Sequence, residues 1–270
     1  MSILYYLGPK GTYSEIAASN IAKSLSNVQL TPISTIAKIV ELVNSNENNY
    51  AILPIENSIE GIVRPTIDNI YMSEVKIQAQ IEINIEHCLV SKGKKSEIKN
   101  IISHPQALAQ CQKYILNNFD ENINLIDASS TSASIELMSN KDETYSAIVS
   151  KKLAEELNYN IHDKNISDVK DNKTRFVLVS KKELKLGEKT RTSIVFNTKN
   201  ESGALLKILS IINKYNLNLI YLESRPSKKV FGEYNFFADI DKGIDELKDA
   251  LKEIEVQCNY YKFLGSYPSV

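Results

Sequence analysis

The chain has 270 residues, of which 43% are hydrophobic and 24% charged, and its formal net charge is −1. Two domains are the first expectation, because a compact domain usually has about 100–150 residues, and the hydrophobic content excludes a disordered chain. The near-neutral charge gives no reason to expect nucleic acid as a partner, since nucleic-acid binding draws on clustered positive charge.

The sequence predicts neither a signal peptide nor a membrane span. The first nine residues lack a basic start, a long apolar core and a small-residue cleavage site, and no stretch approaches the ~18 uncharged apolar residues of a membrane helix. We therefore expect a cytoplasmic protein. The three cysteines, Cys88, Cys111 and Cys258, are far apart, which favours a reduced compartment over a disulfide framework or a structural zinc site.

The first part of the chain alternates short apolar strands with amphipathic helices. Strands are predicted over residues 3–7 and 50–55, and helices over residues 13–25 and 34–43. This alternation predicts a mostly parallel sheet covered by helices.

The apolar pattern between residues 75 and 90 changes phase. Odd-numbered positions are apolar from Val75 to Ile85, whereas after Glu86 the apolar positions are the even ones, Cys88 and Val90. Since neighbouring side chains of a strand point to opposite faces, the change indicates a bulge, a bend or passage into another packing environment. We interpret it as a crossover between two lobes.

A second set of strands and helices follows the phase change. Strands are predicted at residues 101–102, 124–127, 147–149 and 176–179, with helices over residues 105–117, 131–139 and up to residue 157. Two lobes joined by a chain that crosses and returns would leave a cleft between them, which is a favoured place for a small ligand.

Residues 181–189 are charged and poorly periodic, and we place a linker there. Beyond it the predicted order of elements is β-α-β-β-α-β, which is typical of a ferredoxin-like unit. The strands are expected at residues 192–197, 217–224, 234–240 and 260–264, and the helix faces at residues 205–212 and 244–254.

Three of the predicted helices begin with polar residues directly after a strand. These starts contain Thr12 with Glu15 as a capping box, His104 ahead of Gln106 and Gln110, and Ser130 with Thr131. The free N–H groups and the dipole at a helix start can receive a carboxylate, so the three starts could form one anion-binding cleft. Ordinary helix capping is the favoured explanation of the first start taken alone, and a capping or structural role is favoured for His104. At the third start, capping explains one hydroxyl and not necessarily all four of residues 129–132.

Residues 54–61 and 172–176 concentrate polar side chains at strand ends, where ligands of open α/β sheets usually bind. The second segment contains Thr174, Arg175 and Phe176. Arg175 could bind a carboxylate, but composition alone favours a strand start with a surface salt bridge and a core phenylalanine. For residues 54–61, a solvated loop is an equally good explanation.

Together these segments resemble the prephenate dehydratase family over nearly the whole chain. The family's motifs appear in order at residues 6–14, 54–61, 103–111 and 174–176. Gly-Ala-Leu-Leu at residues 203–206 and Glu-Ser-Arg-Pro at residues 223–226 are similar to the phenylalanine-binding motifs of the family's ACT regulatory domain. The departures are Tyr13, where phenylalanine is frequent, and a loose serine-threonine segment at residues 129–134.

The resemblance implies an α/β fold with two domains. Residues 1–182 would form a two-lobed catalytic domain like the type 2 periplasmic binding proteins, with lobe 1 at about residues 1–86 plus 168–182 and lobe 2 at about residues 87–167. Residues 190–270 would form the ferredoxin-like ACT domain.

The resemblance also implies an activity. The chain would be a carbon–oxygen lyase that converts prephenate to phenylpyruvate, water and carbon dioxide in L-phenylalanine biosynthesis, and L-phenylalanine would inhibit it through the ACT domain. A homodimer or homotetramer is implied, and neither a metal nor an organic cofactor. The alternatives are an arogenate dehydratase and a non-catalytic amino-acid sensor, and intact Thr174, Arg175 and Phe176 argue against the sensor.

Individual roles follow from the same resemblance. Thr174 coincides with the family's essential threonine and would hydrogen-bond the leaving oxygen or relay a proton to it, while Glu56 would be the donor if burial keeps it protonated. The other implied catalytic residues are Asn57, Ser103 and Gln110. The implied substrate-binding residues are Thr12, Ser58, Gln106, Ser130, Thr131, Arg175 (which alternatively locks the lobes) and Phe176. The implied effector-binding residues are Asn200, Gly203, Ala204, Leu205, Leu206, Glu223, Ser224 and Arg225.

Overall fold

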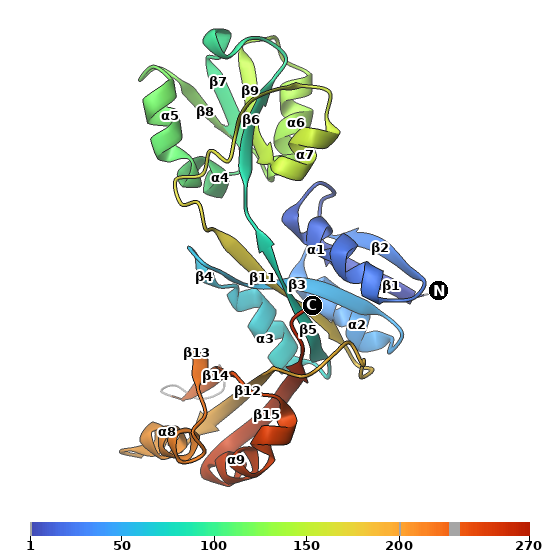
Figure 1. Ribbon diagram of the computed structural model, residues 1–270, viewed down its shortest axis with the longest axis vertical. Helices are drawn as coiled ribbons and strands as arrows, with labels where there is room; N and C mark the ends of the chain where they lie inside the picture. The colour runs from blue at the N-terminus through green and yellow to red at the C-terminus, as the bar shows by residue number, and fades with distance from the viewer. Residues whose placement is uncertain (1, 200, 227–232) are drawn as a thin grey trace.

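The computed structural model describes residues 2–199, 201–226 and 233–270. Three units follow one another along the long axis of the molecule (Figure 1), and each is built on its own sheet. The first lobe lies in the middle, the second lobe at the top and the C-terminal unit at the bottom of the view. No helix in the described part of the chain is long and apolar enough to cross a membrane.

The first lobe contains a mixed sheet of six strands in the order β2-β1-β3-β11-β5, with β4 paired to β3. β1 runs parallel to β2 and β3, whereas β11 runs antiparallel to β3 and β5. Its elements are β1 (Ser2–Leu7), α1 (Tyr13–Ile21), β2 (Val28–Ile33), α2 (Ile36–Ser45), β3 (Tyr50–Asn57), β4 (Gly61–Ile62), α3 (Arg64–Met72), β5 (Lys76–Asn84) and β11 (Lys173–Ser180).

Apolar side chains cover both faces of this sheet. On one face, Ile52 and Leu178 pack with helix α1, and on the other, Leu53 and Val177 pack with α2 and α3. Each fully buried side chain of this size contributes roughly 1.5–3 kcal/mol. Burial on both faces explains why β3 and β11 read as nearly continuous apolar runs.

The second lobe contains a five-stranded sheet in the order β10-β6-β9-β7-β8. β7 is parallel to β8 and β9, and the pairs β6–β9 and β6–β10 are antiparallel. Its elements are β6 (His87–Ser91), β7 (Asn100–Ser103), α4 (Pro105–Gln110), α5 (Gln112–Asn118), β8 (Asn124–Asp127), α6 (Thr131–Ser139), β9 (Tyr145–Ser150), α7 (Lys151–Glu156) and β10 (Asn160–Lys164).

The phase change after Glu86 marks a crossover between the lobes. β5 ends at Asn84 in the first sheet and β6 begins at His87 in the second, and the chain returns between Lys164 and Lys173. The predicted passage into another packing environment is therefore confirmed.

The structure differs from the predicted elements in several places. The helix expected over residues 105–117 is two helices, because Cys111 has a non-helical backbone with φ −116° and ψ 17°. Strands β2 and β10 and helix α3 were not predicted. β2 contains Pro32, α3 begins at Arg64-Pro65, and β10 is a polar edge strand, so none of them shows a clear apolar period.

The C-terminal unit is a four-stranded antiparallel sheet in the order β13-β14-β12-β15, with α8 and α9 packed on one face. This is the predicted β-α-β-β-α-β unit. Its elements are β12 (Arg191–Thr198), α8 (Ala204–Lys214), β13 (Leu219–Pro226), β14 (Tyr234–Ile240), α9 (Ile244–Gln257) and β15 (Cys258–Tyr267).

The other face of the C-terminal sheet packs against the first lobe. Val195, Phe237, Leu264 and Tyr267 belong to the same apolar core as helices α2 and α3. Gly265, at φ +148°, lies directly against the backbone of Ile77 on β5, where a Cβ atom would collide with the Ile77 carbonyl oxygen. The C-terminal unit therefore packs closely against the first lobe.

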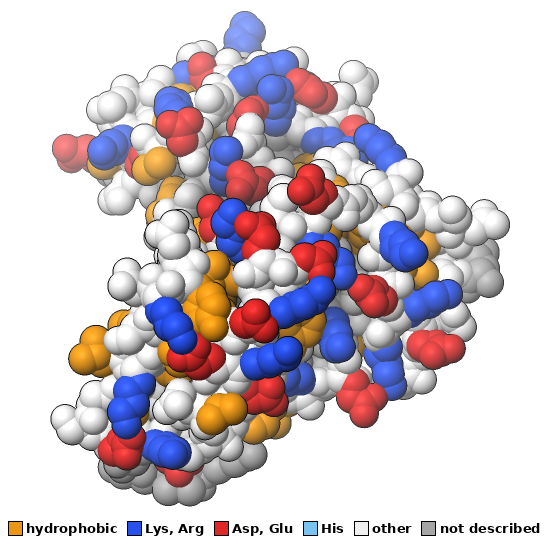
Figure 2. Space-filling view, turned by 60° about the horizontal axis from the view of Figure 1, so that its bottom comes forward, with side chains coloured by type: hydrophobic (Ala, Val, Ile, Leu, Met, Phe, Trp, Pro, Cys, Tyr) orange, Lys and Arg blue, Asp and Glu red, His pale blue; other side chains and the backbone are white. Residues whose placement is uncertain are grey.

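The visible surface carries both charges. In the view of Figure 2, basic and acidic side chains are interspersed over the whole face, in keeping with the net charge of −1. This face offers no single-sign patch of the kind that steers nucleic acid.

Candidate active site

A cavity of about 340 Å³ lies between the two lobes. The starts of helices α1, α4 and α6 and the ends of strands β3 and β11 contribute to its walls. The predicted site residues that line it are Thr12, Asn57, Gln106, Gln110, Ser130, Thr131, Thr174 and Phe176. The cleft expected from the crossing chain thus contains most of the predicted catalytic and substrate-binding residues.

Each of the three helix starts in this cavity is capped by a side chain. Thr12 Oγ1 accepts a hydrogen bond from the Glu15 N–H at 3.4 Å, and Ser130 Oγ accepts one from Ala133 at 3.0 Å. His104 Nδ1 accepts from the Gln106 N–H at 3.2 Å, which is the predicted capping role. The expected capping box is incomplete, because the Glu15 carboxylate accepts from Gly11 N–H at 2.5 Å rather than from Thr12.

The cavity has both apolar and polar side chains in its lining. Among the described residues that line it there is no lysine or arginine. Among the groups around the cavity, the N–H groups and dipoles of the helix starts favour an anionic ligand, and Glu60 is an acidic side chain in the same lining.

A hydrogen-bonded pair, Asn57 and Thr174, lies where β3 ends and β11 begins. Asn57 Nδ2 donates to Thr174 Oγ1 at 2.9 Å, while Asn57 Oδ1 accepts from the N–H groups of Ile59 and Glu60, both at 3.0 Å. The two accepted bonds fix the orientation of the amide. Because Thr174 accepts from Asn57, its own hydroxyl hydrogen remains available for a ligand.

A β-bulge positions this pair. Thr174 lies opposite Asn57 and Arg175 opposite Glu56, but Phe176 lies opposite Pro54, so Ile55 is an extra residue on β3. A bulge shifts the alternation of side chains along one strand. As a result Pro54 and Asn57, three positions apart, both line the cleft together with Thr174 and Phe176.

A chain of amides continues from this pair across the crossover. Asn57 Nδ2 also donates to Asn172 Oδ1 at 2.8 Å, and Asn172 Nδ2 donates to Gln110 Oε1 at 3.2 Å. Gln110 Oε1 lies 3.1 Å from His87 Nε2. The chain links Asn57 of the first lobe to Gln110 of the second.

His87 and Asn172 were missed by the sequence reasoning. His87 is 3% exposed and lines the cavity, and burial lowers its pKa below the ordinary value, which the hydrogen bond to Gln110 only partly offsets. Its Nδ1 atom is buried without a hydrogen-bond partner. The only sequence signal for His87 was its position directly after the phase change at Glu86.

Comparisons with known proteins assign the chain to a family. The model of the prephenate dehydratase family matches residues 4–184. The chain belongs to this family.

Relatives in the family match along nearly the whole chain. A prephenate dehydratase from Methanocaldococcus jannaschii is 39% identical over 99% of this chain and 98% of its own length. A bifunctional chorismate mutase/prephenate dehydratase from Aquifex aeolicus is 37% identical over 97% of this chain and 72% of its own length.

A solved structure gives the same fold. The prephenate dehydratase of Arthrobacter aurescens in complex with L-Phe is 30% identical, with a TM-score of 0.87 over 99% of this chain and 90% of that one. The two-lobed α/β architecture with a C-terminal ferredoxin-like unit is therefore the architecture of the prephenate dehydratase family.

Two residues taken from the family's motifs do not reach the cleft. Glu56 and Arg175 alternate with Asn57 and Thr174 and so project from the opposite face of the sheet, where Arg175 Nε lies 3.0 Å from Glu56 Oε2. Arg175 Nη2 lies 2.7 Å from Asp239 Oδ2 on β14. This corrects both predicted roles, because Glu56 is not placed to protonate a ligand in the cleft and Arg175 does not bind a substrate carboxylate.

Two predicted serines are structural. Ser103 is fully buried and donates to the Ile148 carbonyl at 2.7 Å, which ties β7 to β9. Ser58 accepts from the Lys173 N–H at 2.9 Å and donates to Asn172 Oδ1 at 3.3 Å. Ser103 is therefore corrected from a catalytic residue to a strand contact, and Ser58 from a substrate ligand to a support of the loop after β3.

The predicted effector residues fall into two groups on opposite faces of the C-terminal sheet. Gly203 and Leu206 line a cavity beside helices α8 and α9, with Ala204 and Leu205 next to them in α8. Glu223 and Arg225 project from β13 toward α3, and Ser224 between them is exposed. Asn200 lies outside the described residues. One chain alone does not bring the two groups together.

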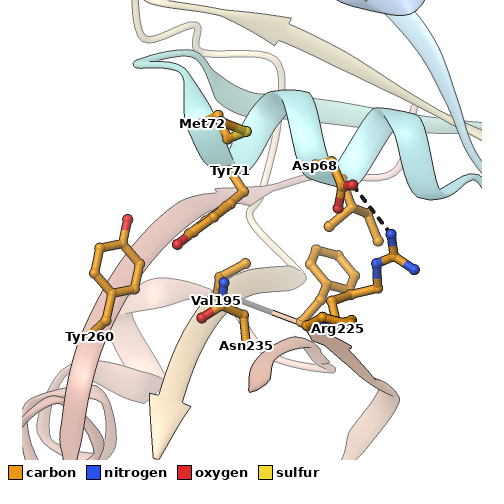
Figure 3. Close-up of a pocket in the computed structure, with 10 residues that line it drawn as sticks. Asp68, Tyr71, Met72, Val195, Arg225, Asn235 and Tyr260 are labelled. Carbon is orange, nitrogen blue, oxygen red and sulfur yellow. Dashed lines mark hydrogen bonds and ion pairs between the residues drawn. The ribbon is translucent and has the colours of Figure 1, made fainter. Parts of the chain in front are cut away.

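Arg225 lines a second cavity, of about 360 Å³, between α3 and the sheet (Figure 3). Its Nη2 atom lies 3.2 Å from Asp68 Oδ2 on α3. Tyr71 of α3 and Tyr260 of β15 meet edge to face at 5.5 Å on the other side of the cavity. The contacts join the C-terminal sheet to α3 rather than to the cleft.

The described residues also contain no group of three or more His, Cys, Asp or Glu side chains arranged to hold a metal ion.

Proposed function

We propose that this chain is a prephenate dehydratase, which converts prephenate to phenylpyruvate, water and carbon dioxide. The observation that carries the proposal is the Asn57–Thr174 pair, hydrogen-bonded at 2.9 Å in a cleft lined by three helix starts. Membership of the prephenate dehydratase family names the substrate for which this arrangement is suited.

The reaction has one difficult step. As the ring carboxylate leaves as carbon dioxide, the electrons of its carbon–carbon bond enter the ring, and the ring hydroxyl departs with the electrons of its carbon–oxygen bond. The ring becomes aromatic, which drives the reaction. The departing oxygen must be protonated or strongly hydrogen-bonded, because hydroxide is a poor leaving group.

Thr174 is the residue placed for that step. Its hydroxyl accepts from Asn57 and can donate its hydrogen to the leaving oxygen. A threonine hydroxyl is a poor free acid, so its role is to orient the oxygen and to relay a proton to it. Asn57 fixes the hydroxyl, and its own amide is fixed by the Ile59 and Glu60 N–H groups.

The remaining residues of the cleft bind the substrate. Prephenate has two carboxylates, and the starts of α1 and α6 at Thr12 and Ser130 offer N–H groups to them. Gln106 and Gln110 supply amide donors from the second lobe, and Phe176 supplies an aromatic wall beside the ring. The substrate is thus bound by both lobes.

We further propose that L-phenylalanine inhibits the enzyme by binding to the C-terminal unit. The two groups of predicted effector residues would form a complete site only where two copies meet. Edge strand β13 supports such a contact, since Ile220 and Leu222 on it are 39% and 38% exposed, and an apolar edge strand favours pairing with another chain. We therefore propose a homodimer or homotetramer, and separately a cytoplasmic location.

The decisive experiment is an assay of the purified protein with prephenate, with and without phenylalanine, beside a parallel assay with arogenate. We expect phenylpyruvate from prephenate, little turnover of arogenate and a lower rate with phenylalanine. Faster turnover of arogenate would assign the activity to the amine substrate instead. If neither substrate is turned over and phenylalanine binds tightly, the result would favour a non-catalytic amino-acid sensor.

A further inference from the structure

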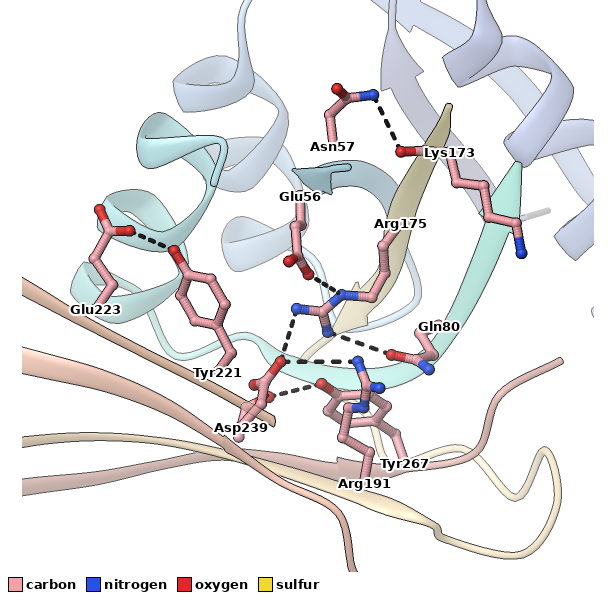
Figure 4. A network of polar contacts seen from close by, with 11 residues as sticks. Glu56, Asn57, Gln80, Lys173, Arg175, Arg191, Tyr221, Glu223, Asp239 and Tyr267 are labelled. Atoms are coloured by element: carbon pink, nitrogen blue, oxygen red, sulfur yellow. Dashed lines mark hydrogen bonds and ion pairs between the residues drawn. The ribbon is translucent and has the colours of Figure 1, made fainter. Parts of the chain in front are cut away.

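A buried ion pair joins the C-terminal sheet to a strand of the cleft. Asp239 of β14 is fully buried and Arg175 of β11 is 5% exposed. Asp239 Oδ2 lies 2.7 Å from Arg175 Nη2 and 4.0 Å from Arg191 Nη1, as Figure 4 shows. None of these three side chains lines the cleft, so the active site does not account for them.

Arg175 is held from several sides. Besides Asp239, its guanidinium contacts Glu56 at 3.0 Å and Gln80 at 3.3 Å. Burial by itself lowers the pKa of Arg175, but the nearby carboxylates of Asp239 and Glu56 outweigh it and hold the pKa above its ordinary value. The group is therefore a permanent cation, and its position depends on where its anionic partners lie.

Asp239 is held just as firmly on its own side. Ser193 Oγ donates to Asp239 Oδ1 at 2.5 Å and lies 2.7 Å from the Tyr267 hydroxyl. The chain after Tyr267 then returns to the first lobe, where the Gln80 N–H donates to the Pro268 carbonyl at 3.0 Å. Since the Gln80 side chain accepts from Arg175, the contacts close a ring through both units.

The pair also lies directly behind the catalytic pair. Thr174 and Asn57 face the cleft, and the next residues on the same two strands, Arg175 and Glu56, face the C-terminal sheet. A shift of Asp239 against the first lobe would therefore act on Arg175, the residue next to Thr174 on β11. Packed elements respond to such shifts by moving as units.

Other polar contacts between the two units end elsewhere. Arg225 pairs with Asp68 of α3, Glu223 pairs with Arg64 of α3, and Lys262 donates to backbone carbonyls of residues 70, 71 and 73 at the end of α3. Among the salt bridges of the described residues, only the Asp239–Arg175 pair joins the C-terminal unit to a strand that lines the cleft.

We infer that the Asp239–Arg175 ion pair is the link through which the C-terminal sheet controls the Asn57–Thr174 pair. An effector bound to the sheet would then change turnover by changing how Asp239 holds Arg175, as coupling between two sites requires. This inference rests on the proposed function for its effector, phenylalanine, but it also predicts a change in the absence of any ligand.

The test uses the full chain with Asp239→Asn, which keeps the shape of the side chain and removes its charge. The matched control is Asp241→Asn, an exposed aspartate that follows the same strand. For wild type we expect phenylalanine to lower kcat with prephenate by ~5-fold or more, the lower end of usual couplings. We expect Asp239→Asn to turn over prephenate with no more than a marginal response to phenylalanine, and Asp241→Asn to behave as wild type.

A ligand-free measurement separates this inference from the proposed function. In Asp239→Asn, amide hydrogens of residues 173–179 should exchange faster than in wild type, while those of α8 and α9 stay protected. If Asp239→Asn fails to fold, Ser193→Ala, which removes one hydrogen bond to Asp239 and no charge, should show both effects more weakly. A folded Asp239→Asn protein with wild-type exchange in β11, or with full inhibition by phenylalanine, would overturn the inference. A wild-type enzyme insensitive to phenylalanine would instead count against the proposed regulation, and hydrogen exchange would still decide about the link.

Discussion

At the scale of single residues, the hydroxyl of Thr174 should decide the rate. Thr174→Ala removes the group placed to contact the leaving oxygen, while Asn57 keeps its hydrogen bond to Asn172. We expect kcat to fall by about 10²–10³-fold, the usual loss when a transition-state hydrogen bond is removed, with a smaller change in KM. Steady-state formation of phenylpyruvate measures the effect.

Thr174→Ser is the matched control, since it keeps the hydroxyl and loses only a methyl group. It should retain most of the activity lost in Thr174→Ala, and circular dichroism should show both variants folded. A folded Thr174→Ala enzyme with near-normal turnover would remove Thr174 from the mechanism.

His87 gives a pH dependence of stability. Burial lowers its pKa in the folded protein below the ordinary 6.5, so the unfolded chain binds the proton first as pH falls. The free energy of unfolding should be level with respect to this group above pH ~7 and decrease below about 6.5, by at most ~1.4 kcal/mol per pH unit. Urea unfolding at several pH values between 7.5 and 5.5 measures the slope.

His87→Gln should flatten part of that slope, because glutamine does not titrate. His162, whose pKa burial also lowers, accounts for the rest, so His162→Gln serves as a comparison. An unchanged slope in His87→Gln would mean that His87 is not buried in its neutral form.

The sequence predicted the positions of some site residues correctly and of others wrongly. Thr174 and Asn57 were predicted because they stand at strand ends within motifs of a recognised family. Glu56 and Arg175 stand in the same motifs, and their opposite orientation follows from strand alternation, but the bulge at Ile55 that sets the register cannot be recognised from composition. A motif identifies the residues at a strand end, but it does not show toward which face of the sheet each side chain points.

At the scale of elements, the two lobes meet at the start of α1. Gly11 has φ +80°, and a Cβ atom there would lie 2.7 Å from Ser132 Oγ of α6 and 3.3 Å from Leu153 of α7. Gly11→Ala should therefore hold the lobes apart and raise KM for prephenate, besides costing about 1–2 kcal/mol for the left-handed backbone. Kinetics and urea unfolding of the variant measure the two effects.

Gly203→Ala is the control that separates the effect of backbone strain from the effect of a collision between the lobes. Gly203 has nearly the same φ, +78°, but a Cβ atom there has no neighbour within 4 Å. Assayed without phenylalanine, it should lose similar stability and keep the wild-type KM. Equal KM values for both variants would show that Gly11 is not a point of lobe contact.

At the scale of the whole molecule, the order of strands and helices was sufficient to predict the fold class but not the way the units pack. Phe236, Ala238 and Ile240 alternate along β14 and pack with α8 and α9, which is the single buried face that such alternation indicates. In the structure Phe237 and Asp239 are 1% and 0% exposed, because the second face of the sheet is covered by the first lobe. The apolar alternation of a strand indicates the face that packs against the helices of its own unit. It does not indicate whether a unit far away in sequence covers the other face.

Removing the last residues of the chain would measure how much the packing of the C-terminal unit on the first lobe contributes to the free energy of unfolding. Gln80 on β5, the edge strand of the first sheet, donates to the Pro268 carbonyl at 3.0 Å and accepts from the Val270 N–H at 2.9 Å. Ending the chain at Tyr267 removes both bonds and uncovers the edge. We expect the free energy of unfolding to fall by ~1–3 kcal/mol, at about 0.5–1.5 kcal/mol for each bond, with more light scattering at high concentration. A chain that ends at Ser269 loses only the Val270 bond and should lie between the two, whereas equal stability of all three chains would mean that the tail does not hold the C-terminal unit to the first lobe.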